Sequence, residues 1–366
     1  MSKIGIGIIG TGFGQIIHIP AFQLHPEAEV VAIYHRDPLK AREIADKYGI
    51  DHACDRLEDL LALPTVQAVA ISTPPSLHYA QAKAAIVAGK HILLEKPVTM
   101  NVQEAIELYQ LALQQNIVTA TDFEFRYVPQ WQYLKHLLAH NYIGKKRLVT
   151  IEWLVQGRAN PNRIWNWYSQ KEFGGGALGA IGSHTFDYVR WLFGDIKSLC
   201  GQLSTGIHAR PDANGNLRNV DSDDTCNILL ELADGTPCNI ALSTVTHRGR
   251  GHWISVYGAD GTLVLGSSNQ SDYVHGFSLR HGKLDRPEME LIPIPPEYEL
   301  PQTYSDGRLA PVLALSDRWI KSIQSEQTML PSLYEGVWSQ LLMDLTRESH
   351  ELRRWIDIPE LVLHKE

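Results

Sequence analysis

The chain has 366 residues, of which 44% are hydrophobic and 20% are charged, and 33 lysines and arginines against 41 aspartates and glutamates leave a net charge of −8. This composition is that of a folded soluble protein long enough for two domains, and it excludes a largely disordered chain. An acidic chain without a run of like charges also argues against nucleic acid or a membrane surface as a partner. Small neutral or weakly acidic molecules remain.

The cysteines and the apolar segments indicate a cytoplasmic protein. The four cysteines show no CxxC spacing, which favours reduced thiols over a disulfide framework or a zinc site. The apolar run at the N-terminus turns into glycines after about seven residues, too early for a signal peptide. No stretch reaches the roughly 18 apolar residues of a membrane span, so we expect no membrane partner.

The first 122 residues alternate short apolar runs with segments of helical periodicity. Runs buried on both faces and joined by crossover helices are typical of a parallel sheet. We therefore predict a doubly wound α/β domain over residues 1–122. The predicted strands are 4–9, 29–34, 68–72, 91–94 and 117–122, with helices at 37–48, 78–88 and 102–115 between them.

From residue 123 onward, strand-like runs are separated by AsnGly, AspGly and GlyAlaAspGly turns. Strands joined by such tight turns predict a large, mostly antiparallel open sheet, so residues 123–366 are predicted to form a second, α+β domain. A helix over 177–193 follows three glycines, and two late helices pack beside this sheet or return to the first domain. The predicted strands are 147–156, 197–203, 225–232, 236–244, 253–257 and 262–265, and the late helices are 310–325 and 334–354.

A glycine-rich turn follows the first predicted strand. Gly10 and Gly12 stand as in a dinucleotide fingerprint, in which glycines permit a tight turn and let a pyrophosphate approach the backbone at a helix N-terminus. The third glycine is Gly14, one position early, and Phe13 lies within the same turn. A turn that merely needs positive φ is the alternative interpretation. The place directly after a strand favours cofactor binding.

The second predicted strand ends in Tyr34, His35 and Arg36. An NAD site usually has a carboxylate at this point for the ribose 2′-hydroxyl, whereas Asp37 comes two residues late. Arg36 is placed to bind a 2′-phosphate, so we favour NADP over NAD as the cofactor, with His35 and Arg36 beside the adenosine ribose. A solvated loop charge is the competing interpretation of Arg36.

A lysine follows the strand predicted at 91–94, in the sequence Glu95-Lys96-Pro97. The carboxyl end of a central parallel strand is where ligands bind in such sheets, and desolvation there brings a lysine toward acid–base chemistry. Position alone leaves catalysis and a phosphate-contacting or salt-bridging role equally open for Lys96.

Taken together, these motifs resemble the Gfo/Idh/MocA oxidoreductase family over nearly the whole chain. The resemblance implies an N-terminal Rossmann domain and a C-terminal domain whose sheet often forms a dimer or tetramer. The implied reaction is hydride transfer between a nicotinamide and the CH–OH group of a sugar, cyclitol or related polyol. The matching motifs are the turn at 10–14, 72–75 with His78, 95–97, 125–127, 174–176, 182–184 and Asp187.

The resemblance also implies roles for individual residues. Lys96 and His184 match the family's acid–base residues, since oxidation of an alcohol needs a base for the hydroxyl proton. The implied cofactor contacts are Thr73, Pro74, His78, Glu95 and Lys96, and the implied substrate contacts include Arg126 and Asp187.

Ala180 departs from the family pattern, because inositol-dehydrogenase-like members have an aspartate four residues before the histidine. On an α-helix that aspartate would share a face with His184 and orient it. Asp187 is a candidate replacement, although we favour a local cap or ion pair with Arg190. A non-catalytic regulatory protein that binds a dinucleotide and a sugar is the alternative function.

Residues 158–168 interleave aromatic, asparagine and arginine side chains. Such a loop suits the faces and hydroxyl edges of a sugar, so Arg163 and Trp165 are candidate substrate contacts, with packing at an interface as the alternative. His247 and His252 stand beside arginines, but their spacing fits no metal geometry. We predict no bound metal.

Overall fold

A computed structural model describes residues 3–269, 275–283 and 285–363 of the chain. The chain forms two compact units: unit 1 comprises Met1–Glu124 and Arg308–Gln340, and unit 2 comprises Phe125–Gly307 and Leu341–Glu366. The sequence suggested one boundary after residue 122. In the structure the chain leaves unit 1 after Glu124 and returns to it for the segment Arg308–Gln340.

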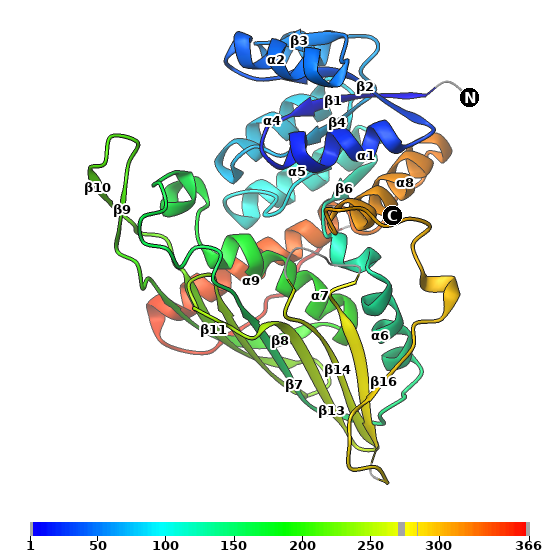
Figure 1. The fold of residues 1–366 in the computed structure, drawn as a ribbon, viewed down its shortest axis with the longest axis vertical. Coiled ribbons are helices and arrows are strands. Elements are labelled where there is room, and N and C mark those ends of the chain that lie inside the picture. The colour runs from blue at the N-terminus through cyan, green and yellow to red at the C-terminus, as the bar shows by residue number, and fades with distance from the viewer. Residues whose placement is uncertain (1–2, 270–274, 284, 364–366) are drawn as a thin grey trace. The chain divides into compact units, whose positions relative to one another are not determined.

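Unit 1 is built on a six-stranded parallel sheet with strand order β3-β2-β1-β4-β5-β6 (Figure 1). Its central strand β1 is buried along its whole length, as expected for a sheet covered on both faces. The predicted doubly wound parallel sheet is therefore confirmed. The strands are β1 (Ile4–Ile9), β2 (Ala28–Tyr34), β3 (His52–Cys54), β4 (Ala68–Ile71), β5 (His91–Leu94) and β6 (Thr119–Thr121).

The helices of unit 1 begin and end at local sequence signals. The Asp37 carboxylate accepts a hydrogen bond from the Leu39 amide at the start of α2, and Gly49 ends that helix with a φ of 66°. Asn101 caps α5 in the same way. The helices are the π-helical turn η1 (Gly14–His18), α1 (Ile19–Leu24), α2 (Pro38–Tyr48), α3 (Leu57–Ala62), α4 (Pro75–Val87), α5 (Val102–Gln114) and α8 (Leu309–Ser325).

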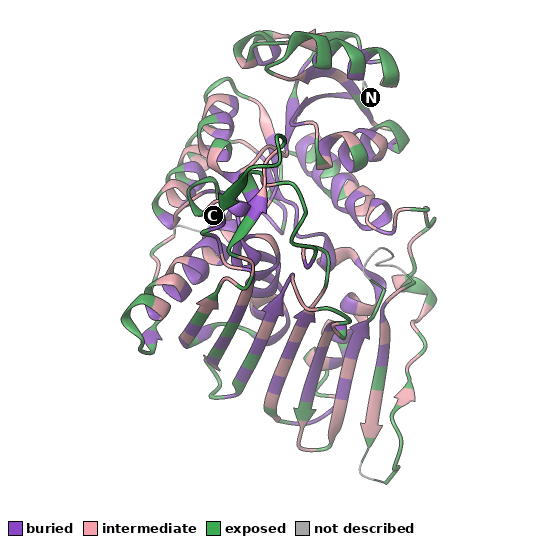
Figure 2. Cartoon of the chain, turned by 60° about the vertical axis from the view of Figure 1, so that its left-hand side comes forward, coloured by how far each residue is buried: buried purple, intermediate pink, exposed green. Residues whose placement is uncertain are grey.

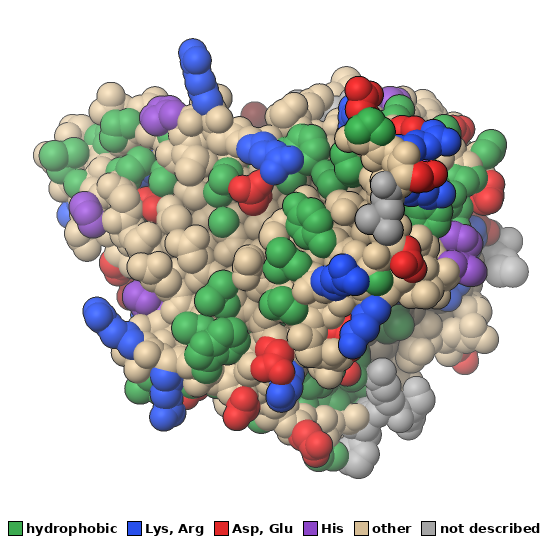
Figure 3. Space-filling view, turned by 90° about the horizontal axis from the view of Figure 1, so that it is seen from below, with side chains coloured by type: hydrophobic (Ala, Val, Ile, Leu, Met, Phe, Trp, Pro, Cys, Tyr) green, Lys and Arg blue, Asp and Glu red, His purple; other side chains and the backbone are tan. Residues whose placement is uncertain are grey.

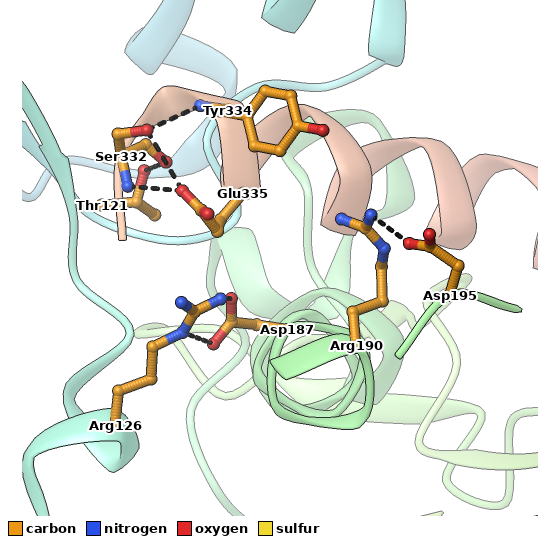
Figure 4. Close-up of polar contacts among 8 residues, drawn as sticks. All are labelled: Thr121, Arg126, Asp187, Arg190, Asp195, Ser332, Tyr334 and Glu335. Atoms are coloured by element: carbon orange, nitrogen blue, oxygen red, sulfur yellow. Dashed lines mark hydrogen bonds and ion pairs between the residues drawn. The ribbon is translucent and has the colours of Figure 1, made fainter. Parts of the chain in front are cut away.

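The returning segment is anchored to unit 1 by packing and by hydrogen bonds. The ring of Trp319 in α8 packs 6.0 Å from that of Phe22 in α1. Ser332, just before α9 (Leu333–Leu352), donates its amide to Glu335 in the manner of a capping box, and its carbonyl accepts from the Thr121 hydroxyl at 2.8 Å (Figure 4). The β6 strand is thereby linked to a segment 211 residues away.

Unit 2 contains a nine-stranded sheet of order β16-β15-β14-β13-β7-β12-β11-β8-β17, in which only the β12–β7 pair is parallel among the described residues. Buried and more exposed residues alternate along its strands (Figure 2), so one face is covered. The predicted, mostly antiparallel open sheet is confirmed. The strands are β7 (Lys146–Leu154), β8 (Ile196–Ser204), β11 (Thr225–Leu232), β12 (Pro237–Ser243), β13 (Gly251–Gly258), β14 (Gly261–Ser267), β15 (Ser278–Lys283), β16 (Glu290–Leu291) and β17 (Ile356–Asp357), and β9 (Ala209–Pro211) pairs with β10 (Leu217–Asn219) in a separate hairpin.

An aromatic core lies between this sheet and its helices. Trp153 of β7 stacks on His252 of β13 with ring centroids 4.1 Å apart, and Trp131 and Phe125 pack against the same histidine. Burial lowers the pKa of His252 to about 3, so it is a neutral core residue. None of the helices in the described part of the chain is long and apolar enough to cross a membrane. The helices are α6 (Pro129–Ala139), α7 (Ser183–Phe193), the π-helical turn η5 (Leu178–Gly182), and the 3₁₀ turns η2 (Glu124–Tyr127), η3 (Trp167–Ser169), η4 (Lys171–Phe173) and η6 (Pro296–Tyr298).

Candidate active site

The glycine turn follows β1 and leads directly into η1. Gly10 has a φ of 112°, and a Cβ there would lie 2.6 Å from the carbonyl carbon of Ser72. A Cβ on Gly14 would lie 2.5 Å from the Ser72 hydroxyl oxygen, whereas a Cβ on Gly12 would meet nothing within 4 Å. Gly10 and Gly14 thus allow close packing, and Gly12 faces open space in which a pyrophosphate can approach the backbone.

The helix after this turn starts with a π-helical turn, which pairs residue i with i+5 instead of i+4. This turn places His18 in the interior of unit 1, where its side chain is fully buried. The Phe13 ring stands edge-on to His18 at 5.3 Å, and the Arg308 guanidinium lies 5.4 Å from the centre of that ring. Single π-helical turns of this kind are frequent at functional sites.

After the end of β2, Arg36 is exposed, whereas the carboxylate of Asp37 is already engaged in hydrogen bonds. The His35 ring nitrogen Nδ1 accepts a hydrogen bond from the Asp37 amide at 3.0 Å, and the Asp37 carboxylate is used as the cap of α2. Arg36 is exposed and forms no ion pair with the described residues. Its guanidinium is therefore available to an anionic group such as a ribose 2′-phosphate.

Thr73 and Pro74 follow the carboxyl end of β4, and His78 lies in the first turn of α4, which begins at Pro75. The buried His78 ring has one nitrogen 2.8 Å from the Thr73 carbonyl oxygen and the other 2.8 Å from the Pro97 carbonyl oxygen. Burial, assisted by the charge of Lys96, lowers the pKa of His78 to about 4. The neutral ring can donate to only one of these carbonyls at a time. His78 therefore links the segment after β4, at Thr73, to the turn after Lys96, at Pro97.

Lys96 is half-buried and lies directly after β5, at the carboxyl edge of the parallel sheet. Its backbone amide donates to Oε2 of Glu95 at 3.2 Å. Glu95 is buried, which raises its pKa, but the hydrogen bond and charge of His18 and the charge of Lys96 lower it further than burial raises it. Glu95 is thus a buried carboxylate held ionised beside the candidate catalytic lysine.

Two further acidic residues follow β6 in the same unit. Nε2 of His18 lies 3.1 Å from Oδ2 of Asp122 and 3.4 Å from Oε1 of Glu95. Burial lowers the pKa of His18, but its hydrogen bonds to Asp122 and Glu95 outweigh this effect and raise the value to about 9. Burial and the Glu95 charge raise the pKa of Asp122 to about 7, and burial with the Asp122 charge raises that of Glu124 well above its ordinary value.

The ligand atoms of His18, Glu95 and Asp122 lie within 4.8 Å of one another, close enough to surround a metal ion. A protonated imidazole has no lone pair for a metal, and the raised pKa of His18 keeps the proton on the ring at neutral pH. The absence of a bound metal stays a prediction from the sequence.

In unit 2, the three glycines lead into η5 and then into α7, which carries His184. A Cβ on Gly176 would lie 2.6 Å from Oδ1 of Asp223, and the Asp223 carboxylate accepts the Leu178 amide at 2.7 Å. His184 is buried, with the Phe125 ring edge-on at 5.1 Å. Asp223 therefore orients the start of the helix that carries the candidate acid–base histidine.

Asp187 and Arg126 bind each other through two hydrogen bonds, from Nε to Oδ2 at 2.9 Å and from Nη2 to Oδ1 at 2.6 Å (Figure 4). Their side chains are 3% and 10% exposed. Arg190 pairs with Asp195, also at 2.6 Å. Arg126, which the resemblance placed among the substrate contacts, is thus a direct partner of Asp187 and contacts both oxygens of its carboxylate.

The loop 158–168 is held by backbone carbonyls of its own and of the β9–β10 hairpin. The exposed Arg163 donates to the Gly157 carbonyl at 2.9 Å, and the half-buried Trp165 indole donates to the Asn219 carbonyl at 2.8 Å. The Arg158 guanidinium lies over the ring of Tyr168. Both predicted substrate contacts are thus ordered side chains of one loop.

Comparison with known proteins agrees with this geometry in both units. Residues 4–123 match the oxidoreductase family's NAD-binding Rossmann fold, and residues 135–358 match its C-terminal alpha/beta domain. The chain belongs to the Gfo/Idh/MocA oxidoreductase family. It is therefore an oxidoreductase with an NAD-binding Rossmann domain.

Relatives align over the full length of this Gfo/Idh/MocA chain. An uncharacterised oxidoreductase of Synechocystis is 52% identical over 361 residues, which are 98% of this chain and 97% of the relative. Levoglucosan dehydrogenase of Pseudarthrobacter phenanthrenivorans is 27% identical over 398 residues, 99% of this chain and 100% of the relative. A solved structure of levoglucosan dehydrogenase with NADH and levoglucosan has a TM-score of 0.89 at 25% identity, covering 98% of this chain and 100% of that one.

The departure from the Gfo/Idh/MocA pattern at Ala180 falls within a π-helical turn. Ala180 lies inside η5, where the π-helical pairing changes which residues share a face with His184. An alanine at this position supplies no carboxylate to orient His184. Sequence reasoning also missed His18, Asp122 and Glu124, although two acidic residues directly after a parallel strand were a signal that could have been followed.

Proposed function

We propose that the protein is an NAD(P)-dependent dehydrogenase that transfers hydride between the nicotinamide and a CH–OH or ketone group of a sugar, cyclitol or related polyol. The observation that carries the proposal is the pair formed by the open glycine turn and the lysine at the end of β5, both at the carboxyl edge of one parallel sheet. Levoglucosan dehydrogenase, a sugar-oxidising relative by name, supports the substrate class.

The proposed chemistry assigns one task to each group. Gly10, Gly12 and Gly14 receive the pyrophosphate, and the bound nicotinamide supplies the hydride acceptor. When an alcohol is oxidised, its carbon loses a hydride to the nicotinamide and its hydroxyl loses a proton to a base, leaving a ketone. We assign Lys96 to this proton and to polarising the oxygen, with His184 as the second acid–base group.

Replacing Lys96 by methionine tests the assignment. Lys96→Met keeps the length of the side chain, so the variant should bind NADH or NADPH as the parent does while turnover with an active sugar falls at least a hundredfold. Lys83→Met is the matched control, because Lys83 lies on the surface of α4, where it binds the exposed Glu107 and the Tyr79 hydroxyl. Unchanged turnover in Lys96→Met would remove Lys96 from the mechanism.

We further propose that NADP is preferred over NAD, on the strength of Arg36. Its exposed guanidinium stands at the end of β2, and the carboxylate that an NAD site would use is engaged as a helix cap. Arg36→Ala should weaken NADPH binding about tenfold or more and leave NADH binding nearly unchanged, as expected for the loss of a charge-assisted contact. Arg42→Ala, an exposed arginine of α2 that pairs with Asp46, is the control.

Ala180 favours one alternative, a regulatory protein that binds a dinucleotide and a sugar without turning them over. A panel of polyols and sugars distinguishes the two functions through the absorbance of NAD(P)H. A sugar that raises the melting temperature in the presence of cofactor, but gives no absorbance change, would support the regulatory function.

We also propose that the uncovered face of the unit 2 sheet forms a homo-oligomer. Leu229 and Tyr257 are 47% and 41% exposed, and the strand registers place both on this face. Hydrophobic side chains stand among charged ones on the part of the surface seen in Figure 3. Leu229→Asp with Tyr257→Asp should reduce the mass measured by light scattering to that of a monomer.

A further inference from the structure

Three ionisable side chains from distant parts of the sequence meet in the interior of unit 1. His18 comes from η1, Glu95 from the end of β5 and Asp122 from the end of β6. They are 0%, 8% and 1% exposed, and His18 Nε2 approaches both carboxylates, at 3.1 Å and 3.4 Å. We refer to these three residues as the buried ion cluster.

The surroundings of the buried ion cluster favour a positive charge within it. Phe13 and Phe22 present aromatic rings to His18, and the charges that act on the cluster are those of Lys96 and Glu124. Two carboxylates without a cation in such a pocket would repel each other and lose their hydration. A protonated imidazole supplies the missing charge at hydrogen-bonding distance, and the raised pKa of His18 is consistent with this state.

The same cluster joins the two parts of unit 1 that the proposed reaction uses. Oε1 of Glu95 faces His18, while Oε2 accepts the backbone amide of Lys96 at 3.2 Å. His18 lies in the helical turn that begins at Gly14, directly after the cofactor-binding glycines. One carboxylate therefore contacts both the helix of the glycine turn and the backbone of the candidate catalytic lysine.

We propose that His18 is a positioning residue for the dehydrogenase reaction: as an imidazolium it holds Glu95 in place and thereby fixes the backbone of Lys96 relative to the glycine turn. This inference rests on the proposed function of Lys96. It adds that the lysine's position depends on a histidine 78 residues away in the sequence, which forms no part of the family resemblance given above.

His18→Gln is the first test, since glutamine can donate a hydrogen bond but carries no charge. With an active sugar, kcat should fall about ten- to a hundredfold because Lys96 is displaced, while the Kd for NADPH changes less than threefold. The double variant His18→Gln/Asp122→Asn should recover part of this loss, because it removes one of the two carboxylates left without a cation. A kcat equal to that of the parent in His18→Gln would overturn the proposal.

A second set of measurements needs no substrate and separates this proposal from the proposed function. Nitrogen-15 NMR of the histidine rings should show His18 as an imidazolium up to about pH 9, and Asp122→Asn should lower its midpoint. The rate at which an acylating reagent labels Lys96, followed by peptide mass spectrometry, should change in His18→Gln while labelling of Lys83 does not. If no sugar is turned over but these results hold, the proposed reaction fails and the positioning role stands.

The free energy of unfolding should depend on whether His18 is protonated. The pKa of His18 is raised on folding from 6.5 to about 9, so its stabilising effect is complete below pH 6.5 and is lost as pH rises through 9. Between pH 7 and 10 the melting temperature of the parent should therefore fall more steeply than that of His18→Gln. A neutral His18 at pH 7, or one equivalent of zinc bound to the parent and absent from His18→Gln, would overturn the proposal.

Discussion

Replacement of Asp187 by asparagine separates a structural ion pair from a catalytic carboxylate. The side chains of Asp187 and Arg126 are almost fully buried and share two hydrogen bonds. Removing one charge of a buried pair leaves the other without compensation, at a cost of about 3–5 kcal/mol. For a unit of this size, we expect Asp187→Asn to lower the melting temperature by roughly 6 to 20 °C.

The same helix provides the matched control. Arg190 and Asp195 lie at the same distance, 2.6 Å, but Asp195 is 73% exposed. Because solvent screens such a pair, Asp195→Asn should cost less than about 1 kcal/mol and should cost nothing measurable in high salt. High salt should leave the effect of Asp187→Asn almost unchanged, since a buried pair is screened much less.

Differential scanning calorimetry with both variants measures this difference, and NADPH binding reports whether unit 1 remains intact. The double variant Arg126→Leu/Asp187→Leu should be more stable than either single variant, because no unpaired charge remains. If Asp187→Asn melts like the parent while its kcat falls a hundredfold, Asp187 acts in the chemistry and the structural interpretation of the pair is wrong.

Four further substitutions test local features of unit 1. Gly12→Ala should leave the melting temperature unchanged and weaken cofactor binding. Gly10→Ala should instead lower the melting temperature, because Gly10 has a φ of 112° and a Cβ there would collide with Ser72. Calorimetry and cofactor titration on both variants measure the contrast. Asp37→Ala removes the cap of α2 and should cost about 1 kcal/mol in urea unfolding without changing NADPH affinity. Glu335→Ala leaves the buried Ser332 amide without its acceptor and should cost about 1–3 kcal/mol by the same measurement.

The parts of unit 1 predicted well from sequence are those whose signals are local. The strands β1, β4 and β5 were recognisable because each is a short apolar run bounded by glycine, proline or polar residues, a signal contained in a few neighbouring positions. The short strand β3 was missed, since its three residues are exposed or half-buried and show no apolar run. In unit 2 the strands β9, β10, β15, β16 and β17 were also missed, since none of them contains a run of apolar residues.

Side-chain partners were harder to predict, as the two arginine pairs of α7 illustrate. Spacing along a helix suggested Arg190 for Asp187 and gave no sign of Arg126, which binds Asp187 from 61 residues earlier. The helix predicted over 177–193 begins with the π-helical turn η5, and a second such turn, η1, follows the glycine turn. Such turns depend on how a helix fits its surroundings and leave no clear signal in the amino-acid pattern.

The sequence by itself determined the fold class, the glycine turn, the position of Lys96 and the family, because hydrogen-bonded elements and their boundaries follow from neighbouring residues. Only the tertiary structure brought His18 to Asp122, 104 residues apart, and Asp187 to Arg126. The order of strands in a sheet decides which strand ends become neighbours, and burial then decides which charges must find a partner. Both are properties of the assembled sheet and core.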